Sequence, residues 1–375
     1  MPRLISTMIA FTIILSAIAP ATARTIGVPG DAGTIGGAMA MANRGDIILV
    51  SCGTYHERNI QMKSGVSLWS GTLQADCAVI DAQGRGRILD FTDCDSTTAV
   101  VGFTLKGGLS PSDGGAIACR NSSPRIARCL IIGNKALRGG GLATSGALGP
   151  RLEECRFEGN TADLHGGAVV WLAGNGSLSR CTMADNQALA GAGLAGLGTG
   201  DLALDRCTFS GNTAASCGGG IWMKSGTASL TSCLLVANHG GLGGGGLAIA
   251  SGGSRLTTCT LADNAAESAG GGILLQSSDL VLERSILAFN RQGAVAIEGE
   301  QRPSLTRCNV YGHQGGDWIG PLADLASQHG NFSDDPKFCS RVQGRYDLRT
   351  GSPCLPGARG GRSSGLVGAL NRGCD

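Results

Sequence analysis

The sequence is poor in aromatic side chains: its 375 residues include eight Phe, four Trp and three Tyr. A globular core of this length normally relies on more of them, because aromatic rings supply much of the buried area. Glycine is abundant instead, with 63 residues. A single narrow solenoid, whose interior is only a few side chains wide, fits this composition better than the two globular domains that length alone suggests.

The sequence also lacks an excess of charge of either sign. Thirty Lys and Arg stand against 28 Asp and Glu, which gives a formal net charge of +2. Proteins that bind a strong polyanion through its backbone charge usually show a larger imbalance. We therefore expect no nucleic-acid partner.

Long apolar runs are missing too, except for one near the start. Arg3 precedes an apolar stretch at residues 8–19, and Ala-Thr-Ala at 21–23 resembles a cleavage site, which is typical of a secretory signal peptide. That run is short for a membrane span, and no second run of spanning length follows. The sequence predicts cleavage near Ala23, no transmembrane segment in the mature chain, and a secreted or cell-surface location, with the periplasm as an alternative.

A 26-residue repeat organises residues 102–313. One column of cysteines recurs at this interval, and a column of asparagines follows five residues behind it. A fixed period of 20–50 residues indicates stacked structural repeats. The cysteine column is Cys129, Cys155, Cys181, Cys207, Cys233 and Cys259, and the asparagine column is Asn134, Asn160, Asn186, Asn212, Asn238, Asn264 and Asn290.

Each repeat reads as short strands separated by turns. The cysteine and the apolar residue two positions after it have strand spacing, with both side chains on one face. No window carries a helical pattern of useful length, so we predict an all-β, single-domain parallel β-helix of 26-residue coils. After the glycines of each repeat we place two more columns inward: Ile117, Ala143, Val169, Ala195, Ile221, Leu247 and Ile273, then Cys119, Ser145, Trp171, Leu197, Met223, Ile249 and Leu275.

Stacking explains why the period is so regular. Neighbouring coils lie about 4.8 Å apart, so equivalent side chains form ladders, and one inserted residue would turn an inward side chain outward. We expect the asparagine amides to bond to one another and the asparagines themselves to adopt the left-handed conformation at a turn.

The two ends of the solenoid need caps. Residues 34–43 predict a short amphipathic cap helix, and residues 46–53 predict the first strand and its turn. We therefore divide the chain into a signal peptide (1–23), an N-terminal cap (24–45), the β-helix (46–313) and a tail (314–375) that caps the C-terminal end.

The fifteen cysteines fall into two groups. The six in the ladder are expected to be free buried thiols, because parallel Cβ vectors one coil apart lie beyond the usual disulfide separation. The others are free to form disulfides in an exported protein. A bridge among Cys339, Cys354 and Cys374 would hold the tail in place, but spacing leaves the pairing open.

Several segments resemble secreted bacterial right-handed parallel β-helix proteins of the pectin-lyase-like superfamily. These segments are VPGDAGTIGGAMAMANRGDIILVSCGTYHERNIQMKSGVSLWSG near the start, GFTLKGG, and DDPKFC with YDLRTGSPCLPG and GLVGAL in the tail. The C-x-Φ-x-x-N repeats are also similar to those of chlamydial polymorphic outer-membrane proteins. The resemblance implies the fold, but the superfamily includes lyases, hydrolases, epimerases and adhesins, so it does not imply one activity.

The best catalytic candidates lie in the column two residues before the cysteines. Glu153 and Asp205 are two coils apart, roughly 9.6 Å, which is near the upper limit for an inverting carboxylate pair. Arg180 and Arg206 stand beside this column and suit an acidic sugar. The alternative interpretation, which we favour, is a surface ion-pair network. Calcium would be implied only if the chain is a lyase, and we expect no other cofactor or metal.

Two further residues have a functional and a structural interpretation each. His165 lies at a glycine turn, where it is either a solvated turn residue or a general base. Trp222 falls between two inward positions and is expected to face outward, where it either covers part of the surface or stacks on a sugar.

The sequence as a whole favours a non-enzymatic, exported β-helix protein with an adhesion or scaffold role. Its partner would be a cell-surface glycan or another surface protein. The alternative is a polysaccharide lyase or glycoside hydrolase that acts on acidic glycans.

Overall fold

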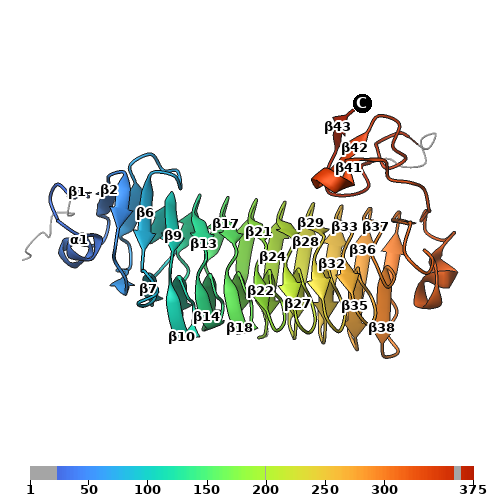
Figure 1. The fold of residues 1–375 in the computed structure, drawn as a ribbon, viewed down its shortest axis with the longest axis horizontal. Coiled ribbons are helices and arrows are strands. Elements are labelled where there is room, and N and C mark those ends of the chain that lie inside the picture. The colour runs from blue at the N-terminus through green and yellow to red at the C-terminus, as the bar shows by residue number, and fades with distance from the viewer. Residues whose placement is uncertain (1–22, 199, 359–364) are drawn as a thin grey trace, which may run out of the picture.

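A computed structural model describes residues 23–198, 200–358 and 365–375. It shows one elongated solenoid of stacked coils, with long parallel sheets along its sides (Figure 1). The predicted signal peptide falls outside the described residues, apart from Ala23. No helix in the described part of the chain is long and apolar enough to cross a membrane. The all-β parallel solenoid predicted from the repeat is confirmed.

Sheet A contains the strand before each ladder cysteine, and its leucine and isoleucine side chains point into the core. Within the described ranges it has twelve strands: β1 (Thr25–Val28), β2 (Ile47–Val50), β5 (Ser67–Ser70), β8 (Ala99–Val101), β12 (Arg125–Ala127), β16 (Arg151–Glu153), β20 (Gly176–Ser179), β24 (Asp201–Asp205), β28 (Thr227–Thr231), β32 (Gly253–Thr257), β36 (Asp279–Glu283) and β39 (Ser304–Thr306).

Sheet B follows the cysteine and carries the apolar column two residues after it. Its described strands number eleven: β3 (Gly53–Tyr55), β6 (Ala78–Asp81), β9 (Phe103–Lys106), β13 (Leu130–Ile132), β17 (Arg156–Glu158), β21 (Thr182–Ala184), β25 (Thr208–Ser210), β29 (Leu234–Val236), β33 (Thr260–Ala262), β37 (Ile286–Ala288) and β40 (Asn309–Tyr311).

Sheet C closes each coil after the glycine turn. In the part of the chain that the structure describes it has ten strands: β4 (Ile60–Gln61), β7 (Leu89–Thr92), β11 (Ile117–Arg120), β15 (Leu142–Ser145), β19 (Val169–Trp171), β23 (Leu194–Gly196), β27 (Ile221–Met223), β31 (Leu247–Ile249), β35 (Ile273–Gln276) and β38 (Val295–Glu298).

Sheet D is a narrower ledge between sheets B and C. It comprises, among the described residues, seven strands: β10 (Leu109–Asp113), β14 (Lys135–Arg138), β18 (Thr161–His165), β22 (Gln187–Ala188), β26 (Thr213–Ala214), β30 (His239–Gly240) and β34 (Ala265–Ala266). Each of these strands begins directly after a ladder asparagine or its equivalent, so the asparagine turn separates sheets B and D.

The register of sheet C corrects part of the predicted core. Leu142 pairs with Ile117 and Val169, so it points inward and Ala143 points outward. Leu194 likewise takes the inward place expected for Ala195, and Thr144 and Gly196 take those expected for Ser145 and Leu197. The core fixes the register, so coils that differ by one residue absorb the difference in the ledge, where β14 and β18 pair through a bulge.

The asparagine ladder is confirmed. In the middle coils, Asn186 donates its amide to the Asn212 side-chain oxygen (Nδ2–Oδ1 2.9 Å) and to the Phe157 carbonyl (3.1 Å). The expected left-handed conformation belongs instead to the residue before each asparagine, such as Asp185 (φ 55°), and to the residue before each ladder cysteine, such as Arg180 (φ 51°). The asparagine side chain therefore caps a turn that its predecessor makes.

The cysteine ladder is confirmed as well. All six thiols are free and buried, and the Cys155 thiol interacts with those of Cys129 and Cys181 on either side. Burial raises the pKa of the Cys155 thiol, so it stays protonated and unreactive. The ladder therefore behaves as a row of small apolar residues.

The first strand of the solenoid lies earlier in the chain than predicted. Helix α1 (Ile35–Met41) forms as expected, with the Thr34 hydroxyl accepting from Gly37 N (3.0 Å) and the Glu57 carboxylate accepting from Ile35 N (2.7 Å). The first strand, however, is β1, which precedes the helix and pairs with β2. The coil begins there because β1 carries the same alternating apolar pattern as the strands that follow.

The tail does more than cap the end. The 3₁₀ helix η1 (Gly320–Leu325) covers the last coil with Leu322. Strand β41 (Phe338–Ser340), the 3₁₀ helix η2 (Arg341–Gln343), and strands β42 (Arg345–Arg349) and β43 (Arg372–Cys374) then fold back along the flank of the solenoid, near β33 and β37 (Figure 1). They cover apolar side chains on the outer face of sheet B, including Leu234 and Ile286, which water would otherwise reach.

Two disulfides join cysteines outside the ladder. Cys339 pairs with Cys374 and ties β41 to β43, which settles the pairing that spacing left open in the tail, and the Cys354 sulfur instead accepts from Asn309 Nδ2 (3.3 Å). Cys52 pairs with Cys77 in the first coils.

Candidate functional site

Glu153 and Asp205 lie on the outer face of sheet A, at the ends of β16 and β24, with Ser179 of β20 between them. Each carboxylate is held by a different arginine. Arg125 bonds Glu153 (Nη2–Oε2 2.7 Å), and Arg206 bonds Asp205 (Nη1–Oδ2 3.1 Å). The two acids share a face but do not converge on one point, which is the geometry of separate ion pairs.

Glu154 joins two neighbouring coils through arginines. Arg128 donates to Glu154 (Nε–Oε2 3.1 Å) from one side, and Arg180 donates (Nη2–Oε1 2.8 Å) from the other. Hydrogen bonds from Arg128 first, and then from Arg180, lower the pKa of the Glu154 carboxyl. All three side chains are exposed, so the network contributes little stability and serves mainly to orient two guanidinium groups.

Two depressions flank these strands of sheet A. The first, of about 310 Å³, lies where β12, β16 and β20 begin, and includes Arg125, Arg151 and Asn175 in its lining. The second, of about 570 Å³, lies beyond their other ends and includes Arg128 and Glu154. The strands between them are three or four residues long, so the depressions are roughly 10 Å apart.

The face between the depressions carries more positive than negative charge. Glu154 serves two arginines, and Arg151 makes no ion pair among the described residues. This part of the surface, which we call the arginine face, comprises Arg125, Arg128, Arg151, Arg156, Arg180 and Arg206, with Glu153, Glu154, Glu158 and Asp205. With the exposed Asp201 at the start of β24, six cations stand against five anions, and this excess favours a ligand that carries negative charge.

The floor of the first depression is built from glycine for a packing reason. A Cβ atom on Gly176 would lie 1.7 Å from the Trp171 ring, and one on Gly149 would lie 2.6 Å from it. Trp171 is 2% exposed and fills the core at this corner. Only glycine therefore lets the chain pass over the indole, and Arg125 and Arg151, which are register partners on neighbouring strands, line the depression beside this floor.

The described residues do not fit the calcium site that the lyase alternative implies. Calcium takes six to eight oxygen ligands. No group of three Asp, Glu, His or Cys side chains within the described ranges is placed to hold a metal. The carboxylates of Glu153 and Asp205 are engaged by guanidinium groups instead.

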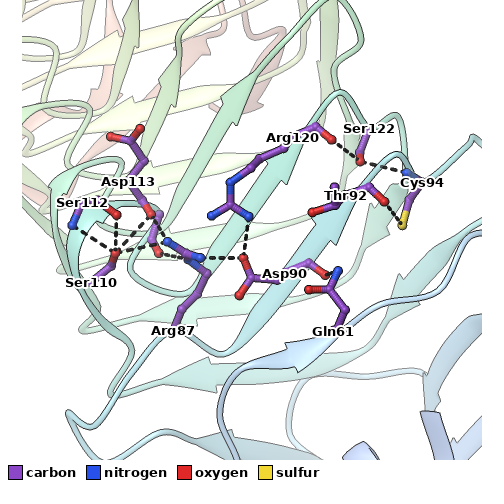
Figure 2. Close-up of polar contacts among 11 residues, drawn as sticks. Gln61, Arg87, Asp90, Thr92, Cys94, Ser110, Ser112, Asp113, Arg120 and Ser122 are labelled. Atoms are coloured by element: carbon purple, nitrogen blue, oxygen red, sulfur yellow. Dashed lines mark hydrogen bonds and ion pairs between the residues drawn. The ribbon is translucent and has the colours of Figure 1, made fainter. Parts of the chain in front are cut away.

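A second polar cluster lies near the start of the ledge, at residues that the sequence analysis did not select (Figure 2). Arg87 donates to Asp90 (Nη1–Oδ1 2.5 Å), to the Gly114 carbonyl (2.8 Å) and to the Asp113 carbonyl (2.6 Å), and Arg120 also bonds Asp90 (3.0 Å). The side chains of Arg87 and Asp90 are 12% and 14% exposed. The cluster therefore pins the first ledge strand to sheet C. Arg87 and Asp90 precede the regular repeat, where a search along columns finds no signal.

The structure brings His165 and Trp222 together, although they belong to different columns of the repeat. Their ring centroids are 5.0 Å apart, with the planes tilted by 46°. Burial, followed by the positive charges of Lys224 and Arg138, lowers the pKa of His165, so its imidazole is neutral at neutral pH. Trp222 faces outward, as its position between two inward residues predicted.

Comparison with known proteins identifies the architecture. The family model of the right-handed β-helix region matches residues 91–261 and 167–321. Among solved structures, pectate lyase Pel9A superposes with a TM-score of 0.58 over 94% of this chain and 97% of its own, at 12% sequence identity. Likeness at this identity shows the fold alone, and together with the family model it confirms the predicted right-handed parallel β-helix. A search of the curated proteins found no match.

Proposed function

Because this chain belongs to the right-handed β-helix family, we propose that it is an exported interaction protein that binds an acidic polysaccharide on its arginine face. The observation that carries the proposal is the cationic excess between the two depressions on sheet A. Guanidinium groups bind carboxylates and sulfates through paired hydrogen bonds, so a row of them suits a linear anionic glycan.

The spacing of charged groups supports a chain-like ligand. Arg151 lines the first depression and Arg128 the second, and strands of sheet A separate them by roughly 10 Å. Arg180 continues the row one coil further along the solenoid. An extended polymer would meet several cations at once, and weak single contacts would then add through multivalency.

The disulfides support a location outside the cytoplasm. Cys52–Cys77 and Cys339–Cys374 tie down segments at both ends of the solenoid. Such bonds persist in oxidising compartments, which is consistent with the signal peptide predicted at residues 1–23. We propose a secreted or cell-surface protein on this basis.

A polysaccharide lyase or hydrolase is the second candidate. The fold likeness to a pectate lyase favours it, and Glu153 and Asp205 face the same side of sheet A. In a hydrolase one of these carboxyl groups would protonate the glycosidic oxygen while the other activated water. The guanidinium partners of Glu153 and Asp205 argue against this role. A general acid must be protonated before it can donate, whereas an ion pair with arginine stabilises the ionised carboxylate.

Binding of defined glycans tests the proposal. Polygalacturonate, alginate and a neutral glucan would be titrated into the protein at several salt concentrations. We expect affinity for the acidic chains only, falling as salt rises. Loss of both guanidinium groups of the first depression, in Arg125→Gln with Arg151→Gln, should weaken binding by tenfold or more, at about 1.5–3 kcal/mol for each charged hydrogen bond.

The matched control is Arg291→Gln, a substitution of the same kind at an exposed arginine that follows the last ladder asparagine, outside sheet A. Binding that is equal for neutral and acidic glycans, or unchanged in the double variant, would refute the proposal. Release of unsaturated or reducing ends by the wild-type protein, and its loss in Asp205→Asn, would establish the enzymatic alternative instead.

A further inference from the structure

A second candidate site lies on sheet C, away from the arginine face. Trp222 projects from the outer face of β27, and His165 ends the ledge strand β18. The two rings are in contact, and both remain partly exposed. An aromatic ring and an imidazole side by side on a solenoid surface resemble neither the ladders nor the ion-pair networks elsewhere on the chain.

The geometry makes Trp222 a platform. Trp222 lies in register two coils after Val170, and Val170 belongs to the same coil as His165. The backbones of residues 165 and 222 are therefore roughly 9.6 Å apart along the solenoid axis. A centroid distance of 5.0 Å therefore requires the indole and the imidazole together to span the intervening coil. That coil presents Ala195, which is fully buried beneath it. Small residues below the ring let it lie along the surface.

Covering the sheet does not by itself require an indole. The register partners of Trp222 on both sides are Ala195 and Ala248, and Ala143 stands three coils earlier in the same row. These alanines are at most 2% exposed. Trp222 packs on the outward cluster of Ala143, Val170 and Ala195, so part of its ring serves as a cover, while the side chain as a whole remains partly exposed at the surface.

The polar groups around the platform are positioned for a ligand. Lys224 follows Trp222 by two residues, so it projects from the same face, and its ammonium group makes no ion pair among the described residues. His165 is half-buried, and its Nδ1 atom is buried without a hydrogen-bond partner in the part of the chain that the structure describes. Its Nε2 edge is then available for hydrogen bonding at the rim of the indole.

We propose that Trp222, His165 and Lys224 form a binding site for one sugar residue that carries a carboxylate. The apolar face of the sugar ring stacks on the indole, a hydroxyl group pairs with the imidazole, and the carboxylate pairs with the ammonium group. The site is separate from the arginine face and does not depend on it. A glycan that contacts both would be held at two sides of the solenoid.

Tryptophan fluorescence and calorimetry test this site directly. Galacturonic acid, its trimer and a neutral cello-oligosaccharide would be titrated into the full chain. We expect a fluorescence change with both carboxylated probes, tighter binding of the trimer if a polymer is the natural source, and weaker binding of the neutral sugar. Trp222→Leu keeps an apolar cover but removes the flat face, and should weaken binding by about tenfold or more.

Two further variants separate the contributions. Lys224→Gln should weaken only the carboxylated probes, and His165→Phe should weaken both classes while keeping a ring against the indole. The control Trp318→Leu removes a partly buried indole at the C-terminal cap and should leave binding unchanged. A wild-type chain that binds no carboxylated probe at millimolar concentration, or a Trp222→Leu variant that binds like wild type, overturns the proposal. The Arg125→Gln, Arg151→Gln protein should still show the fluorescence change, so failure of one site is distinguishable from failure of the other.

Discussion

Replacement of Asn212 by alanine tests whether the asparagine ladder holds the coils together. Asn212 is fully buried in the middle of the ladder. Its amide nitrogen donates to the Met183 carbonyl (2.9 Å) and to Asn238 Oδ1 (2.9 Å), and its oxygen accepts from the backbone N–H (3.1 Å) and the side chain (2.9 Å) of Asn186. Four hydrogen bonds would be lost at once.

The magnitude follows from the groups left without partners. The Asn186 side chain keeps its bonds to two carbonyl oxygens, and Asn238 Oδ1 keeps the backbone N–H of residue 212. The Asn186 N–H and the Met183 carbonyl lose their side-chain partner inside the protein. At about 1–3 kcal/mol for each buried group left unsatisfied, we expect a loss of roughly 3–5 kcal/mol in the free energy of unfolding.

Urea unfolding followed by circular dichroism and by tryptophan fluorescence measures this loss. Coincident transitions are needed first, because stacked repeats can unfold in parts. The matched control is Asn175→Ala, which removes an exposed asparagine that accepts one hydrogen bond from Asp201 N. If Asn212→Ala costs no more than Asn175→Ala, about 1 kcal/mol or less, the ladder does not stabilise the fold as argued.

Three other substitutions test contacts elsewhere in the structure. Arg87→Met should lower the free energy of unfolding by about 3 kcal/mol, because the substitution leaves the Asp90 carboxylate and the carbonyl groups of Asp113 and Gly114 with fewer partners. Amide hydrogen exchange at residues 109–113 should become faster, and an unchanged exchange rate at these residues would contradict the assignment. Cys374→Ser should free the tail for proteolysis and cost about 3–4 kcal/mol for a 35-residue loop closed by Cys339, whereas unchanged digestion would count against the tail packing. Backbone hydrogen bonds, the largest from Asn43, lower the pKa of Asp46 to about 2, so its contribution is present above the unfolded pKa near 4 and is lost as pH falls toward 2. Melting curves between pH 5 and pH 2 should therefore differ less between wild type and Asp46→Asn as the solution becomes more acidic, and a constant difference would contradict the assignment.

The candidate sites differ in how far the sequence could locate them. Residues at multiples of 26 must align along the solenoid, so the sequence predicts that Glu153 and Asp205 share one face, with Arg180 and Arg206 beside them. It could not say that Glu153 is held by Arg125, because that contact runs diagonally between coils and depends on side-chain conformation. The first depression depends on Gly149 and Gly176 passing over Trp171, a contact that no column reveals.

The sequence alone determined the coil and its inner ladders. A repeat of 26 residues places each cysteine and each asparagine directly over the equivalent residue of the next coil. Because the interior is the same in every coil, all members of a ladder have the same surroundings. The tertiary structure decided what happens outside that core. A bulge in the ledge shifts Ala143 and Ala195 to the outer face, and the indole of Trp222 reaches His165 from 57 residues further along the chain. Close packing in the core restricts the conformation of the inward side chains. The outward side chains can contact several neighbours on adjacent coils, so only the tertiary structure shows which contacts form.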